Sequence, residues 1–92
     1  MTKTIYLVYD VPSAGTGDWY QSKPTYHKFE AIRNARIAWE YLTEHEKSKR
    51  YVYVGAHTVS VPEDDVRAAS RVYKDMMDDD TWPADHDVIT IQ

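Results

Sequence analysis

The acidic stretch from Asp78 to Asp87, DDDTWPADHD, holds the residue types in this chain that could most readily do chemistry. Five aspartates, one histidine and one tryptophan occupy its ten positions. Carboxylate and imidazole groups can hold a metal ion. A dense set of carboxylates can also face a basic protein surface that normally contacts phosphates. The stretch therefore suggests either a metal site or a protein-binding surface.

The metal interpretation is weakened by the spacing of the stretch. An EF-hand loop that started at Asp78 would need an acidic residue at position five, glycine at six and glutamate at twelve. This chain has other residues at those places: Trp82, Pro83 and Ile89. Three adjacent polar residues remain as ligands for an alternative function, a small metal-dependent enzyme or metal-binding domain: Asp85, His86 and Asp87. Because neighbouring residues seldom converge on one ion without a remote ligand, we predict no metal and no cofactor.

Catalytic motifs are also missing from the sequence. The chain has no cysteine, which excludes a thiolate nucleophile, a disulfide framework and a thiolate zinc site. His45 and Glu46 do not continue into an H-E-x-x-H zinc motif, and no G-x-S-x-G elbow is present. The two glycines of the loop 12–19 complete neither a dinucleotide fingerprint nor a P-loop. We therefore predict no catalytic residue and a protein that is not an enzyme.

Charge is distributed unevenly along the chain, whose net charge is −4. Residues 1–61 carry eight Lys and Arg against six Asp and Glu, whereas residues 62–92 carry three against nine. Binding to nucleic acid depends largely on Lys and Arg that neutralise phosphates, so an acidic chain is a poor direct ligand for nucleic acid. A basic surface on a nucleic-acid-binding protein or complex is the better candidate partner.

Aromatic residues make up 13% of the chain, more than a core of this size needs. Tyr and Trp are enriched at protein interfaces because they bury a large area and keep a polar group. Tyr51 and Tyr53 could alternatively cover the outer face of a sheet beneath a helix. The predicted partner-binding residues combine aromatic anchors with carboxylates: Tyr51, Tyr53, Asp64, Asp65, Asp75, Asp78, Asp79, Asp80, Trp82, Asp85 and Asp87.

The elements that must position these residues form one domain over residues 1–92. Alternating apolar residues predict a strand at 4–11, and an apolar stripe with three alanines predicts a helix at 27–47. A capping box from Ser60 to Glu63 predicts the start of a second helix that continues to about residue 77. A final strand follows at 87–92. Asp78–Asp80 lie where negative charge opposes the helix dipole, which suggests a role other than helix formation.

Residues 51–61, YVYVGAHTVSV, change their alternation part-way along. Val52 and Val54 are at even positions, whereas Val59 and Val61 are at odd positions, so one unbroken strand cannot place all four on one face. A two-residue hairpin turn at Gly55-Ala56 would bring them together, and a bulge at Gly55 is the alternative. The predicted class is therefore α+β, ordered β-α-β-β-α-β or β-α-β-α-β, with two helices packed on a mainly antiparallel sheet.

No apolar run approaches the length of a membrane span, and the first residues lack the pattern of a signal peptide. We therefore expect a cytoplasmic protein without a membrane partner. In size and charge it resembles, in general style, the small acidic inhibitors that phages use against host nucleases and CRISPR complexes. The predicted function is an inhibitor or modulator that blocks a basic, nucleic-acid-handling protein surface. Self-association as a homodimer or structural protein, through an exposed strand edge or aromatic patch, is a further alternative.

Overall fold

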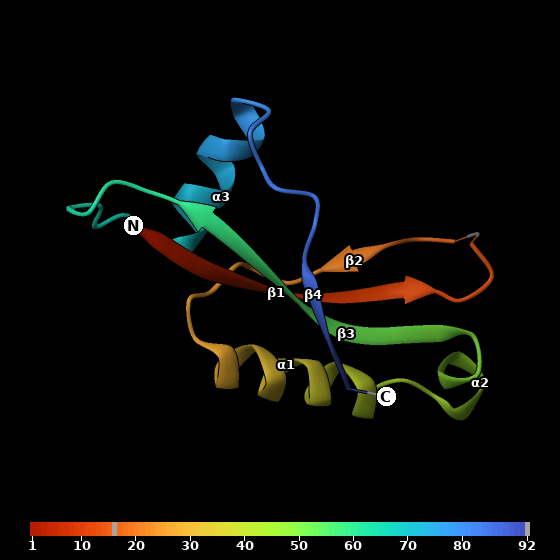
Figure 1. The fold of residues 1–92 in the computed structure, drawn as a ribbon. Helices are drawn as coiled ribbons and strands as arrows, with labels where there is room; N and C mark the ends of the chain where they lie inside the picture. Colours follow the sequence, from red (N-terminus) through yellow and green to blue (C-terminus); the bar gives the residue numbers. More distant parts are fainter. Residues whose placement is uncertain (16, 92) are drawn as a thin grey trace.

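The computed structural model describes residues 1–15 and 17–91, which form a four-stranded antiparallel sheet and three helices (Figure 1). The strands lie in the order β2-β1-β3-β4. The elements in chain order are β1 (Thr2–Pro12), β2 (Tyr20–Gln21), α1 (Lys28–Glu40), α2 (Glu44–Lys47), β3 (Arg50–Ser60), α3 (Ala69–Asp78) and β4 (Asp87–Thr90). The predicted α+β class with helices packed on an antiparallel sheet is confirmed.

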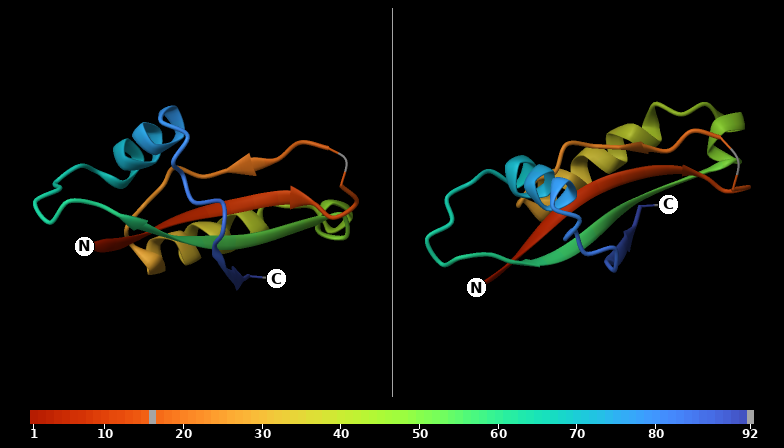
Figure 2. Two further views of the ribbon diagram at one scale, coloured as in Figure 1. Left: turned by 45° about the horizontal axis from the view of Figure 1, so that its top comes forward. Right: turned by 90° about the horizontal axis from the view of Figure 1, so that it is seen from above.

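The long pair of β1 and β3 is the frame of the molecule. Its register runs without interruption from Thr2 opposite Ser60 to Pro12 opposite Arg50. The hairpin predicted at Gly55-Ala56 is therefore wrong, and this pairing contains no bulge. In Figure 2 the β1–β3 ribbon runs along the length of the molecule, with α2 at one end and the β3–α3 connection at the other. The molecule measures 46 × 25 × 18 Å, which reflects this ribbon.

The change of alternation in β3 arises because the strand contributes to two cores, one on each face of the sheet. Val52 and Val54 pack with Val8 against Ala31 and Ala35 of α1. The two buried alanines let the helix lie close to the strands, as the predicted alanine stripe indicated.

The second core lies at the other end of the ribbon, where Ile5 and Val59 pack against Ala69 and Val72 of α3. Figure 1 shows α1 and α3 on opposite sides of the β1–β3 ribbon. Because side chains alternate along a strand, even positions of β3 face α1 and odd positions face α3. Two-sided burial therefore replaces the turn that the sequence suggested.

The helix boundaries differ from the predicted ones at two places. The predicted helix 27–47 divides into α1 and α2, because Thr43 and Glu46 form a capping box that starts a new helix. The predicted capping box at Ser60 is wrong, since Ser60 is the last residue of β3 and pairs with Thr2. α3 begins only at Ala69, whose preceding residue provides no side-chain cap.

Across residues 1–15 and 17–91, none of the helices has the length and apolar character needed to cross a membrane.

Candidate functional site

Six aromatic and imidazole rings pack together on the α3 side of the sheet. We name them the ring cluster: Tyr9, Tyr53, His57, Tyr73, Trp82 and His86. The Tyr9 centroid lies 5.1 Å from that of Tyr53 and 5.6 Å from that of His86, with both pairs stacked. The His57 ring lies 4.5 Å from His86 and 4.7 Å from Trp82. These separations are typical of favourable ring contacts, so the cluster ties β1 and β3 to α3 and to the chain that follows it.

His57 is the polar centre of the ring cluster, and only 1% of it is exposed. Its Nδ1 lies 2.9 Å from the carbonyl oxygen of Pro83, which can only accept, so Nδ1 carries the proton. Nε2 of the neutral ring then accepts from the Tyr9 hydroxyl at 2.9 Å. Burial lowers the pKa of His57 and raises the pKa of Tyr9 to about 12. Because both nitrogens already have protein partners, His57 is placed to hold structure rather than to transfer protons.

Gly55 provides the space in which the ring cluster forms. A Cβ atom at this position would lie 2.5 Å from Cε2 of Tyr9 and 3.0 Å from Cδ2 of His86. The Tyr9 ring therefore crosses directly over Gly55 to reach His57. The glycine is required by the closeness of these rings, since its backbone is not among those with positive φ.

The face of the sheet beside the ring cluster is only partly covered. Strand register places four side chains on it, which we name the open face: Tyr51, Tyr53, Val88 and Thr90. Tyr51 and Val88 are each 56% exposed, and Tyr53 is half-buried under His86. Exposed aromatic and aliphatic groups of this kind can anchor a protein partner.

Trp82 was predicted to be an aromatic anchor for a partner, but it is not exposed. It is half-buried, packs against the α3 core and meets the Tyr73 ring edge-on at 4.7 Å. A tryptophan in this position covers the core, because moving it out would expose His57 to water.

Three of the predicted partner-binding carboxylates are paired within the chain. Arg67 bridges Asp65 and Asp75, with nitrogen–oxygen distances of 2.6 and 2.9 Å, and Lys74 pairs with Asp78 at 2.8 Å. Hydrogen bonds from Arg67 lower the pKa of Asp65 to about 2 and also lower the pKa of Asp75. Asp65 and Asp75 are therefore already engaged in holding the segment before α3 against the helix, whereas Asp78 pairs within α3.

The other acidic residues of the C-terminal third are exposed and form no ion pair with any Lys or Arg that the structure describes. They are Glu63, Asp64, Asp79, Asp80, Asp85 and Asp87. Asp85 and Asp87 flank His86 in the chain, and His86 stacks on Tyr53 of the open face. The two carboxylates therefore belong to the chain segment that borders the open face, although the register places Asp87, opposite Ala56, on the other face of the sheet.

Asp80 has a structural role that the sequence analysis did not identify. Its φ of 58° is left-handed, and it occupies the position just after the C-cap of α3. Thr81 N–H donates to the Met76 carbonyl at 2.8 Å, and Asp80 N–H donates to the Met77 carbonyl at 3.2 Å. This is the Schellman arrangement, in which glycine is usual and aspartate is tolerated. The acidic run therefore includes the residue that ends the helix.

The alternative metal ligands do not converge. His86 turns into the ring cluster, and its Nδ1 donates to the Ala84 carbonyl at 2.9 Å. Within residues 1–15 and 17–91, no three His, Asp or Glu side chains lie close enough together to hold an ion.

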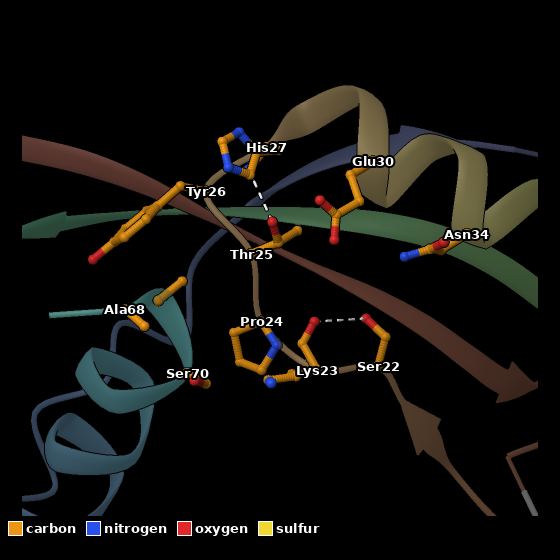
Figure 3. Close-up of a pocket in the computed structure, with 11 residues that line it drawn as sticks. Ser22, Lys23, Pro24, Thr25, Tyr26, His27, Glu30, Asn34, Ala68 and Ser70 are labelled. Atoms are coloured by element: carbon orange, nitrogen blue, oxygen red, sulfur yellow. Dashed lines mark hydrogen bonds between the residues drawn. The ribbon is translucent and has the colours of Figure 1, made fainter.

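A groove of about 580 Å³ lies between the segment leading into α1 and the start of α3 (Figure 3). Lys23, His27 and Glu30 contribute charged or titratable groups, and Ser70 lines the α3 side. This groove could not be predicted from the sequence, because its two walls are about forty residues apart in the chain and meet only after folding.

Comparisons of the chain with protein-family models, with curated proteins and with solved structures found no match in any of the three. The residues and their geometry are therefore the basis of the functional proposal.

Proposed function

We propose that this chain is a non-enzymatic protein-binding module that inhibits or modulates a basic, nucleic-acid-handling protein. The observation that supports the proposal most is that the exposed residues Asp85 and Asp87 flank His86 in the chain, and that His86 stacks on Tyr53 of the open face. Neither carboxylate has a cation partner in the described chain, and Tyr51 and Val88 of the open face are exposed. Carboxylates beside exposed aromatic groups suit a partner surface that is basic at its rim and apolar at its centre.

Recognition would divide between these two kinds of group. The open face would be buried against apolar groups of the partner, which supplies most of the affinity. Asp85 and Asp87 would meet Lys or Arg side chains that otherwise contact phosphates. Asp64, Asp79 and Asp80 lie further away, at the two ends of α3, and would speed association through long-range attraction.

The experiment begins with capture of partners from a cell lysate on the tagged chain, followed by elution with increasing salt. A captured protein is then purified, and its affinity for the chain and for nucleic acid is measured. The test variant carries Asp85→Asn and Asp87→Asn. The control variant carries Glu30→Gln and Glu44→Gln, which removes the same charge from the α1 side.

The proposal expects a complex that weakens steeply with salt and competes with nucleic acid for the partner. The test variant should raise Kd by about tenfold, as expected for two exposed ion pairs, and the control should leave it unchanged. Equal affinity of the test variant, or a partner that still binds nucleic acid in the complex, would contradict the proposal.

A further inference from the structure

The outer side of α1 exposes large apolar residues that the core does not use. Phe29, Ile37 and Tyr41 are 80%, 46% and 83% exposed, and Tyr41 keeps helical geometry as the C-cap. Their spacing of four and eight residues places them with Arg33 along one stripe of the helix. An apolar stripe of this kind is costly to leave in water, which indicates that another surface covers it.

The charges on this stripe follow an order along the helix axis. Arg33 and Arg36 precede Glu40, which is the last residue of α1. Arg36 and Glu40 have the i,i+4 spacing at which helix residues can form an ion pair. Within the described residues, however, none of Arg33, Arg36 and Glu40 forms an ion pair. Together with Ile37 and Tyr41 they line a shallow hollow of about 380 Å³.

A partner for this stripe needs the opposite order of charge. A phosphate backbone or an anionic membrane would attract Arg33 and Arg36 but repel Glu40. A second copy of the same helix in the reversed direction can place its Glu40 opposite Arg33 and its Arg33 opposite Glu40. A second copy of this chain therefore fits the stripe.

We propose that two copies associate through α1 in an antiparallel, two-fold symmetric pair. The axis passes beside Arg36 and Ile37, so that Arg33 faces Glu40 of the partner subunit, and the same contact occurs twice. Ile37 is buried near the axis, while Phe29 and Tyr41 cover its edges. The open face lies on the other side of the sheet and stays accessible, so this inference stands apart from the proposed function.

The pairing is tested with the whole chain by sedimentation equilibrium over a concentration series up to roughly 0.5 mM, which covers micromolar to millimolar Kd values. Arg33→Glu and Glu40→Arg should each raise the dimer Kd by about tenfold, because each single change turns two symmetry-related ion pairs into repulsions. The double variant should return Kd to within about threefold of the original, since it restores both pairs with their signs exchanged.

Two further variants separate the apolar and charge contributions. Ile37→Glu places a charge at the axis and should leave only monomer over the same concentrations. Lys49→Glu makes the same charge change as Arg33→Glu at an exposed site away from the stripe and should leave Kd unchanged. All changed side chains are exposed, so circular dichroism should show an unchanged fold.

The proposal is overturned by a chain that stays monomeric throughout the series. It is equally overturned by a dimer that Ile37→Glu does not disrupt, or by a double variant whose dimer Kd does not return toward the original value.

Discussion

Replacing Gly55 with alanine tests whether the ring cluster forms only because residue 55 has no side chain. The new Cβ would lie 2.5 Å from Cε2 of Tyr9, which is too close for two nonbonded carbon atoms. The Tyr9 ring must therefore move away from β3. Since its hydroxyl donates to Nε2 of His57 at 2.9 Å, the movement breaks that hydrogen bond.

The expected loss of stability combines three contributions. Overpacking beside the strand costs about 1–3 kcal/mol. A buried imidazole nitrogen left without a donor costs about another 1–3 kcal/mol. The lower entropy of alanine in the unfolded chain returns about 0.4–1 kcal/mol, because Gly55 does not have positive φ. We expect a net destabilisation of about 3 kcal/mol, which corresponds to a decrease in Tm of roughly 10–20 °C in a domain of this size.

Urea unfolding followed by circular dichroism measures this loss, and a double-mutant cycle identifies its cause. In a Tyr9→Ala background, Gly55→Ala should cost much less, because the clashing ring is gone and only His86, whose Cδ2 lies 3.0 Å from the new Cβ, must shift. Gly15→Ala serves as the control, since Gly15 has φ +75 and nothing within 4 Å of its Cβ position. It should cost about 1 kcal/mol in both backgrounds. Additive effects of Tyr9→Ala and Gly55→Ala, within about 0.5 kcal/mol, would refute the packing argument.

Three further predictions concern single titratable residues. The pKa of His57 is lower in the folded chain than in the unfolded one, so the free energy of unfolding should fall as the pH drops below about 6.5, by at most about 1.4 kcal/mol per pH unit. Denaturant unfolding at stepped pH measures this fall, and a free energy of unfolding that stays constant from pH 7.5 to 5.5 would contradict it. Asp80→Gly should raise the free energy of unfolding by about 0.5–1 kcal/mol, because glycine suits φ 58° and the change removes negative charge from the end of α3. Asp80→Asn removes only the charge, so it should give a smaller gain in the same urea assay. Arg67→Ala should raise the pKa of Asp65 from about 2 toward its ordinary value, as measured by NMR titration of the side-chain carboxyl carbon, and an unmoved pKa would show that Arg67 is not its cause.

The fold class and the buried alanine side of α1 could be predicted because they depend on local periodicity. Ala31 and Ala35 were expected against the sheet and are buried there. The path of β3 could not be predicted in this way, because alternation shows which residues are buried but not on which face. Val54 and Val59 belong to different cores, and only the positions of α1 and α3 in three dimensions reveal this.

The candidate site was predictable in part. Asp85, Asp87 and Tyr51 are exposed, as the composition of their segments indicated. The pairing of Asp65 and Asp75 by Arg67 was missed, although the three residues lie within eleven positions of the chain. Their contact depends on the late start of α3, which the sequence placed several residues too early. Ring contacts across β1 and β3 depend on register and could not be read from spacing.

The register of β1 with β3 also limits how this chain can fold. Thr2 pairs with Ser60, so the outermost contact of the ribbon closes a loop of almost sixty residues. Even the innermost contact, Pro12 with Arg50, joins residues far apart in the chain. Neither core can form before β1 pairs with β3, because Ile5 belongs to one core and Val8 to the other. High contact order of this kind slows folding and makes it cooperative. On the ribosome, β1 must wait until β3 has left the exit tunnel, which leaves its apolar residues available to chaperones during synthesis.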